Sequence, residues 1–153
     1  MGRDTSEEIA ARYHRSTLTT GDIILSIVGT IGKVAMVPIP LYGGNITQSS
    51  VRIRPVPSGI IPTFLAWALR TPVLISQYDR RRLGTAVPRL NVQDVRLLAI
   101  PLPPVAEQQR IVTEIERRFS MADESEAQVE ASLRRSEGLR QAILKRAFEG
   151  RLG

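Results

Sequence analysis

A stretch without proline, from Val105 to Gly150, follows the proline-rich segment Pro101-Leu102-Pro103-Pro104. The stretch is charged and rich in residues that favour helix, which predicts one continuous helix over residues 105–149. Residues 107–148 alone would form a helix of about 60 Å, longer than a domain of ~100 residues can cover. Such a helix therefore needs a partner for its apolar side chains.

The spacing of apolar residues in this stretch is typical of a coiled coil. A strict three-four spacing can be followed through eleven positions, and eight of them are apolar. Glu126, Ser136 and Arg140 interrupt the seam, and polar residues at such positions favour one register or partner. We expect the helix to pair antiparallel with a second copy of itself. The helix-pairing residues would be Val112, Ile115, Phe119, Ala122, Val129, Leu133, Ile143 and Ala147.

The chain before the proline-rich segment has the pattern of a small sheet. The β-branched run 23–28 predicts a buried strand, and residues 33–37 predict a second strand, joined to the first by the turn 29–32. Residues 49–54 alternate polar and apolar side chains, as a half-exposed strand does. These strands predict a hairpin and one further strand.

Helical segments follow the strands. A buried helix is expected over 62–70 and a second over 73–82, followed by the loop 84–89. The remaining expected elements are a short helix within 4–16, a single turn at Asp94-Val95 capped by Asn91, and a last strand over 97–100. The predicted fold class is thus α+β, with a small mixed α/β domain at 1–103 and a long coiled-coil-forming helix in 104–153.

The excess positive charge lies entirely in the first part of the chain. Residues 1–106 hold twelve basic and six acidic side chains, whereas residues 107–153 hold nine of each. Nineteen of the 21 basic residues are arginine, which suits bidentate contacts with phosphate groups and guanine edges. A bland explanation stays open, because a GC-rich genome favours arginine codons whatever the function. The excess charge points toward a polyanionic partner, of which double-stranded DNA is one example.

The clearest basic cluster is Arg80-Arg81-Arg82, at the end of an expected helix and beside a glycine-containing loop. Arginines placed there can neutralise several phosphates while one or two neighbouring side chains reach base edges. The alternative is an ordinary solvated helix terminus, where cations are mildly stabilising. The candidate DNA-binding residues are Lys33, Gln48, Arg80, Arg81, Arg82, Thr85, Arg89 and Asn91.

No pattern in the chain predicts catalysis, a metal site or a bound cofactor. There is no cysteine, and the single histidine, His14, has no carboxylate or second histidine near it in the sequence. Gly29-Thr30-Ile31-Gly32-Lys33 resembles a phosphate-binding loop, but Ile27 and Val34 stand where that motif needs glycine and a hydroxyl. The N-terminal residues are charged and no apolar run is long enough to span a bilayer, so the sequence predicts a cytoplasmic protein without membrane contact.

Six segments, in order along the chain, resemble the specificity subunits of type I restriction-modification systems. In that family a target recognition domain reads half of a split DNA site, and a long helix spaces it from a second recognition domain and docks modification subunits. The resemblance implies that methylation and cleavage belong to partner subunits, which use S-adenosylmethionine and ATP. The segments are Gly21–Ser26, Gly29–Val34, Leu90-Asn91 through Asp94-Val95, Ile100–Pro104, Glu107–Val112 and Ala147–Leu152.

The chain departs from the family pattern of two recognition domains and two helices, since it has one helix and a recognition region of about 100 residues. We therefore expect a truncated gene product, an expressed fragment or a half-subunit that dimerises through its helix. A rival hypothesis is an interaction module that oligomerises or occupies modification subunits without reading DNA. A nuclease or methyltransferase fragment is disfavoured by the missing motifs.

Overall fold

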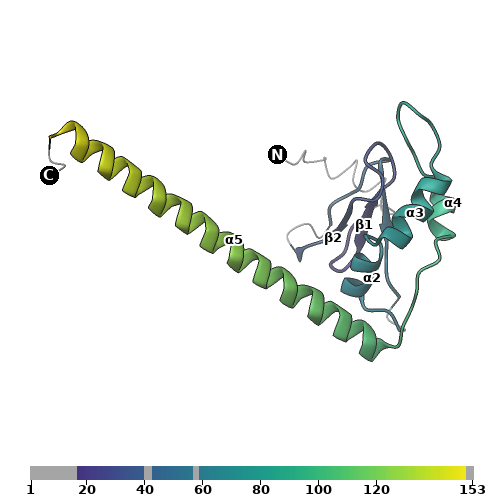
Figure 1. Ribbon diagram of the computed structural model, residues 1–153. Helices are drawn as coiled ribbons and strands as arrows, with labels where there is room; N and C mark the ends of the chain where they lie inside the picture. Colours follow the sequence, from purple (N-terminus) through teal and green to yellow (C-terminus); the bar gives the residue numbers. More distant parts are fainter. Residues whose placement is uncertain (1–16, 40–42, 57–58, 151–153) are drawn as a thin grey trace. The chain divides into compact units, whose positions relative to one another are not determined.

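The computed structural model describes residues 17–39, 43–56 and 59–150. Its sheet has three antiparallel strands in the order β2-β1-β3, with β1 in the centre (Figure 1). Ile23 of β1 lies opposite Met36 of β2 and Ile53 of β3. The predicted hairpin and third strand are confirmed. The strands are β1 (Ile23–Ser26), β2 (Val34–Met36) and β3 (Ser50–Ile53).

Three short helices follow the sheet in the sequence. Proline occupies the start of α2 and of α3, where its missing N–H group leaves no helical hydrogen bond unmade. These two helices and the turn after Asn91 are confirmed. The helices are α2 (Pro62–Ala68), α3 (Pro72–Arg81) and α4 (Val92–Arg96).

The core forms where alternate residues of β1 meet α2 and α3. Ile23 packs with Leu65 of α2 and with Leu69, the C-cap residue of that helix, while Leu25 packs with Leu74 and Tyr78 of α3. Successive strand side chains point to opposite faces, so the period-two pattern of β1 places Ile23 and Leu25 together on the helix-facing side. β1 is therefore the central element of the core.

The segment 97–100 is not a strand, contrary to the prediction. The side-chain amide of Gln77 takes the place of a neighbouring strand: it donates to the Ala99 carbonyl and accepts from the Ala99 N–H, both at 2.9 Å. Asn91 occupies the N-cap position of α4 but makes no side-chain capping bond, so the predicted capping role was also wrong. Its backbone carbonyl accepts from Asp94 N–H at 3.0 Å instead.

The predicted long helix is confirmed as α5 (Val105–Phe148). Its first two turns belong to the first of two compact units, which ends at Val112, while residues from Thr113 onward form the second unit. In the first unit Val112 packs against Phe64 and Ala68 of α2. We call Val105–Val112 the root of α5. The predicted α+β class is confirmed, with a small sheet-and-helix unit and one long helix.

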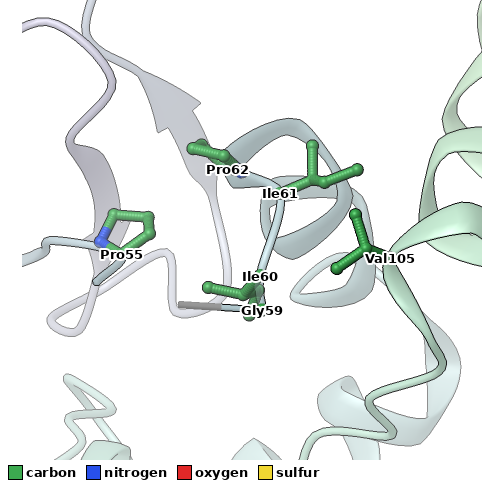
Figure 2. Close-up of a pocket in the computed structure, with 6 residues that line it drawn as sticks. All are labelled: Pro55, Gly59, Ile60, Ile61, Pro62 and Val105. Carbon is green, nitrogen blue, oxygen red and sulfur yellow. The ribbon is translucent and has the colours of Figure 1, made fainter. Parts of the chain in front are cut away.

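The root also borders an open apolar hollow of about 350 Å³. In Figure 2, Pro55 and Val105 lie on opposite sides of the segment Gly59–Pro62, which forms the rest of the lining. None of the six lining residues carries a titratable side chain. In the described part of the chain, no helix is both long and apolar enough to cross a membrane. The expected helix within 4–16 and His14 lie outside the described residues.

Candidate nucleic-acid interface

Three loops are joined by backbone hydrogen bonds at the end of β1. Ile27 donates its N–H to the Ser49 carbonyl and accepts from Leu90 N–H, both at 2.8 Å. Gly29 N–H donates to the Pro88 carbonyl, also at 2.8 Å. The turn after β1, the loop before β3 and the loop between α3 and α4 therefore form one continuous surface.

The loop between α3 and α4 is closed at its base. Leu83 and Arg89 exchange two backbone hydrogen bonds of 2.9 Å, which leaves Gly84–Pro88 as a short protrusion (Figure 1, between α3 and α4). Gly84 has φ +82°, and a Cβ there would lie 2.9 Å from the Val87 carbonyl oxygen. Only glycine fits this turn without a shift of backbone, so the protrusion has a defined shape.

The turn between β1 and β2 needs its glycines for their backbone conformation, and Gly32 also for close packing. Gly29 and Gly32 have positive φ, and a Cβ on Gly32 would lie 3.2 Å from the ring of Tyr78. The Tyr78 hydroxyl donates to the Leu69 carbonyl at 2.8 Å, and burial raises the pKa of Tyr78 to about 12. The turn is thus held against α3, and its position in a hairpin, as predicted, differs from the strand-to-helix site of a phosphate-binding loop.

The structure brings the predicted DNA-binding residues to this surface or to the end of α3 beside it. Lys33 follows the β1–β2 turn, Gln48 precedes β3, and Thr85 and Arg89 belong to the loop after α3. All four side chains are exposed, as is that of Asn91. Residues more than 30 positions apart in sequence are therefore close to one another through their loops, which sequence spacing alone does not reveal.

The three consecutive arginines differ in their surroundings. Arg81 is half-buried and donates to the carbonyls of Gln77 (3.3 Å) and Leu97 (3.5 Å), while Arg82 lies 3.7 Å from the Asp79 carboxylate. Within the described residues, the exposed side chain of Arg80 forms no hydrogen bond or ion pair, and the same holds for Arg89. Of the four arginines predicted to bind DNA, Arg80 and Arg89 are therefore the most available to a phosphate group.

Arg52 of β3 and Arg54, just after that strand, stabilise the fold. Arg54 binds the buried Asp22 carboxylate through two hydrogen bonds of 2.7 Å, and Arg52 donates to the Thr17 carbonyl. The Arg54 hydrogen bonds hold the pKa of Asp22 at about 2, below its ordinary value of 3.8. Part of the positive charge in the first unit is thus neutralised internally. In the described part of the chain, no group of three or more acidic or histidine side chains could hold a metal ion.

Three polar residues were not predicted from the sequence. Arg96, exposed in the last turn of α4, adds a further cation next to Leu97, whose carbonyl accepts from Arg81. Gln77 and Gln108 act through buried or half-buried amides rather than through charge. The cation at the end of a predicted helical turn was a usable signal for Arg96, whereas nothing in the pattern distinguished the glutamines from their neighbours.

The predicted pairing residues of α5 fall into two environments. Val112 is buried against α2 within the first unit, and Ile115 is half-buried. From Phe119 onward the predicted seam is exposed, with Val129, Leu133 and Ile143 between 56% and 60% accessible. The exposed seam residues are Phe119, Ala122, Val129, Leu133, Ile143 and Ala147.

Acidic and basic side chains of the second unit are concentrated in different halves of α5. Residues 113–126 hold five acidic and two basic side chains, whereas residues 127–148 hold two acidic and five basic ones. The ion pairs within the helix, such as Glu114–Arg118 and Glu130–Arg134, join exposed side chains three or four positions apart. An antiparallel copy of such a helix would place each acidic half beside a basic half.

The family described as "Type I restriction modification DNA specificity domain" matches residues 1–135. The type I restriction enzyme EcoBI specificity subunit of Escherichia coli is 37% identical over 150 residues, covering 98% of this chain and 31% of the relative. The EcoDI specificity subunit of the same species is 32% identical, covering 87% of this chain and 29% of the relative. The chain thus spans about a third of the length of these relatives.

A solved structure is similar as well. The HsdS subunit from Thermoanaerobacter tengcongensis superposes with a TM-score of 0.61 at 29% sequence identity. The similarity covers 71% of this chain and 28% of that one. Both the sequence and the fold comparisons therefore lead to the same family.

Proposed function

This chain belongs to the family of type I restriction-modification DNA specificity domains, and on that premise we propose that its first unit reads duplex DNA without catalysing a reaction. The reading surface is the group of three loops at the end of β1, together with the arginines at the end of α3. It recognises one half of a split site. The observation that carries this proposal is that exposed Lys33 and Arg89 lie on loops that are hydrogen-bonded to one another, with exposed Arg80 beside them at the end of α3.

Within this surface the residues have different tasks. Lys33, Arg80, Arg82 and Arg89 contact phosphates, which fixes the protein on the duplex and supplies most of the affinity. The amide and hydroxyl side chains of Gln48, Thr85 and Asn91 are suited to base edges in the major groove. Arg81 holds the end of α3 to the segment after α4, so its removal disturbs the surface as well as its charge.

A fluorescence anisotropy titration of a randomised duplex library at two salt concentrations tests the reading of DNA. We expect log Kd to depend steeply on log salt, and the triple substitution of Arg80, Arg82 and Arg89 by alanine to reduce the slope by about 3. The matched control replaces three exposed arginines of α5, Arg110, Arg118 and Arg134, and leaves the slope unchanged. Absence of binding to any duplex by the folded protein would instead favour the interaction module.

The second part of the proposal concerns residues 104–153, which act as a spacer and pairing helix. The exposed seam and the opposite charges of its two halves support antiparallel pairing with a second copy of this chain. Two recognition surfaces are then held at a separation that the helix length sets. The same helices dock the modification (methyltransferase) subunits. The methyltransferase and ATP-dependent nuclease activities belong to partner subunits of the complex. Sedimentation equilibrium checks the pairing: a mass equal to the 17.0 kDa chain at micromolar concentration contradicts it.

A further inference from the structure

Gln108 is the most deeply enclosed polar side chain of α5, with no accessible surface. Its carbonyl oxygen accepts from Ile61 N–H at 2.8 Å, and its amide nitrogen donates to the carbonyls of Gly59 and Pro103, each at 2.8 Å. One side chain therefore joins three backbone segments: the entry to α2, the loop before it and the proline-rich segment.

These three bonds satisfy groups that would otherwise have no partner. Ile61 is the N-cap residue of α2 and precedes Pro62, while the prolines at 101, 103 and 104 supply no N–H donors to their neighbours. The amide of Gln108 offers an acceptor and two donors at one point, which matches one N–H and two carbonyl groups. No charged or apolar side chain of that size can make the same set.

Gln77 completes the restraint on the segment between α4 and α5. It bonds both backbone groups of Ala99, five residues before Pro104, and the Pro104 carbonyl accepts from Glu107 and Gln108 N–H groups at 2.9 and 3.0 Å. A proline-rich stretch often acts as a semi-rigid spacer. Here its two ends are fixed to the first unit by side-chain amides.

We infer that Gln108 is a positioning residue: it holds the root of α5 against the entry to α2 and the proline-rich segment, so that these first two turns stay attached to the first unit. The contribution of that attachment to half-site spacing rests on the proposed DNA-reading function. The restraint itself does not, because every bond that creates it lies among residues 59–108.

A distance distribution between two spin labels tests the inference without DNA. The chain contains no cysteine, so Val73→Cys on α3 and Ala106→Cys in the root of α5, both exposed and both within the first unit, carry the labels uniquely. Dilution with unlabelled protein removes distances between copies. In the parent we expect one narrow distribution, and in Gln108→Leu and the milder Gln108→Asn a distribution roughly twofold wider, since partners of the buried amide are left unbonded.

The control is Gln109→Leu, at the exposed neighbouring position, which keeps the parent width. Amide exchange gives a second readout: Ile61 should exchange about tenfold faster in the Gln108 variants, while Leu25, at the centre of the core, stays protected. Gln108→Asn serves where Gln108→Leu fails to fold. A parent distribution that is already broad, or unchanged width in a folded Gln108 variant, overturns the inference. Loss of DNA binding alone does not overturn the inference, so the two proposals can fail separately.

Discussion

The first unit and the part of α5 beyond Val112 use apolar residues in opposite ways. In the first unit Ile23, Leu25 and Leu69 have no accessible surface, whereas Leu133 and Leu139 of α5 are at least 60% exposed. The ion pairs differ too: Asp22 is buried beneath Arg54, while the pairs of Glu114 and Glu130 lie in solvent. The first unit is stabilised by its own contacts, and the helix depends on local propensity and on what covers it.

The largest expected contrast comes from removing one leucine in each region. Leu69→Ala opens a cavity between α2 and β1 and should lower the free energy of unfolding by about 2–5 kcal/mol. Leu139→Ala on α5 should change it by less than about 0.5 kcal/mol. Urea denaturation followed by the single tryptophan, Trp67 of α2, reports both variants. Similar losses in the two variants would contradict the comparison.

A charge placed in the exposed seam tests whether a second helix covers it. Leu133→Asp removes an apolar contact from each copy and should weaken pairing on the order of 3 kcal/mol. Sedimentation equilibrium should then give a mass near 17.0 kDa where the parent gives about twice that value. Ser132→Asp is the adjacent control and should leave the mass of the pair unaltered. An unchanged mass for Leu133→Asp would remove this residue from the interface.

The buried ion pair of the first unit predicts an acid-dependent loss of stability. Because folding lowers the Asp22 pKa from 3.8 to about 2, ionised Asp22 stabilises the fold fully above pH 4 or so. That stabilisation is lost as the pH falls from about 4 to about 2. Asp22→Asn should lose about 1–2 kcal/mol at neutral pH, allowing for the half-exposed Arg54, and should respond less to acid in this window.

Urea midpoints measured at neutral pH and at several values down to pH 2 check this prediction. The control is Asp79→Asn, which removes the exposed ion pair between Asp79 and Arg82, whose nitrogen and oxygen atoms lie 3.7 Å apart. This substitution should leave the midpoint unchanged. If Asp22→Asn and Asp79→Asn behave alike, the buried pair does not stabilise the first unit.

The smallest expected effect is a gain in the helix. A Cβ added to Gly138 would meet no atom within 4 Å, so Gly138→Ala fits and should stabilise α5 by up to about 1 kcal/mol. Circular dichroism at 222 nm during heating measures the change in melting temperature, with Ala131→Gly as the reverse substitution. A lower melting temperature for Gly138→Ala would show that the glycine contacts a partner too closely for a methyl group.

Sequence patterns predicted the elements whose cause is local. The proline-free stretch predicted α5 almost to its ends, and β-branched runs predicted the hairpin, because propensity and period act over neighbouring residues. The strand expected over 97–100 failed because Gln77, more than twenty positions earlier, satisfies the backbone of Ala99. A bond to a distant side chain has no signature in the segment that receives it.

Only part of the candidate interface was predictable, because sequence patterns report local features and not contacts between distant residues. Arg80 and Arg89 stand out as charges beside a glycine loop, and the structure brings Lys33 and Gln48 to that surface through backbone bonds of Ile27 and Gly29. Their roles in DNA binding stay predictions. Charge alone did not separate Arg80 from Arg54, whose guanidinium group is held by Asp22. That difference depends on tertiary contacts.

The boundary at Val112 affects when the first unit can fold during translation. The contacts of the first unit are complete once the root of α5 has been made, whereas residues 113–153 come later. Domains generally fold as units, with the N-terminal part first. We expect the first unit to fold while the rest of α5 is still being translated. The loop surface would then exist before the helix can meet any partner, so assembly begins from a finished recognition unit.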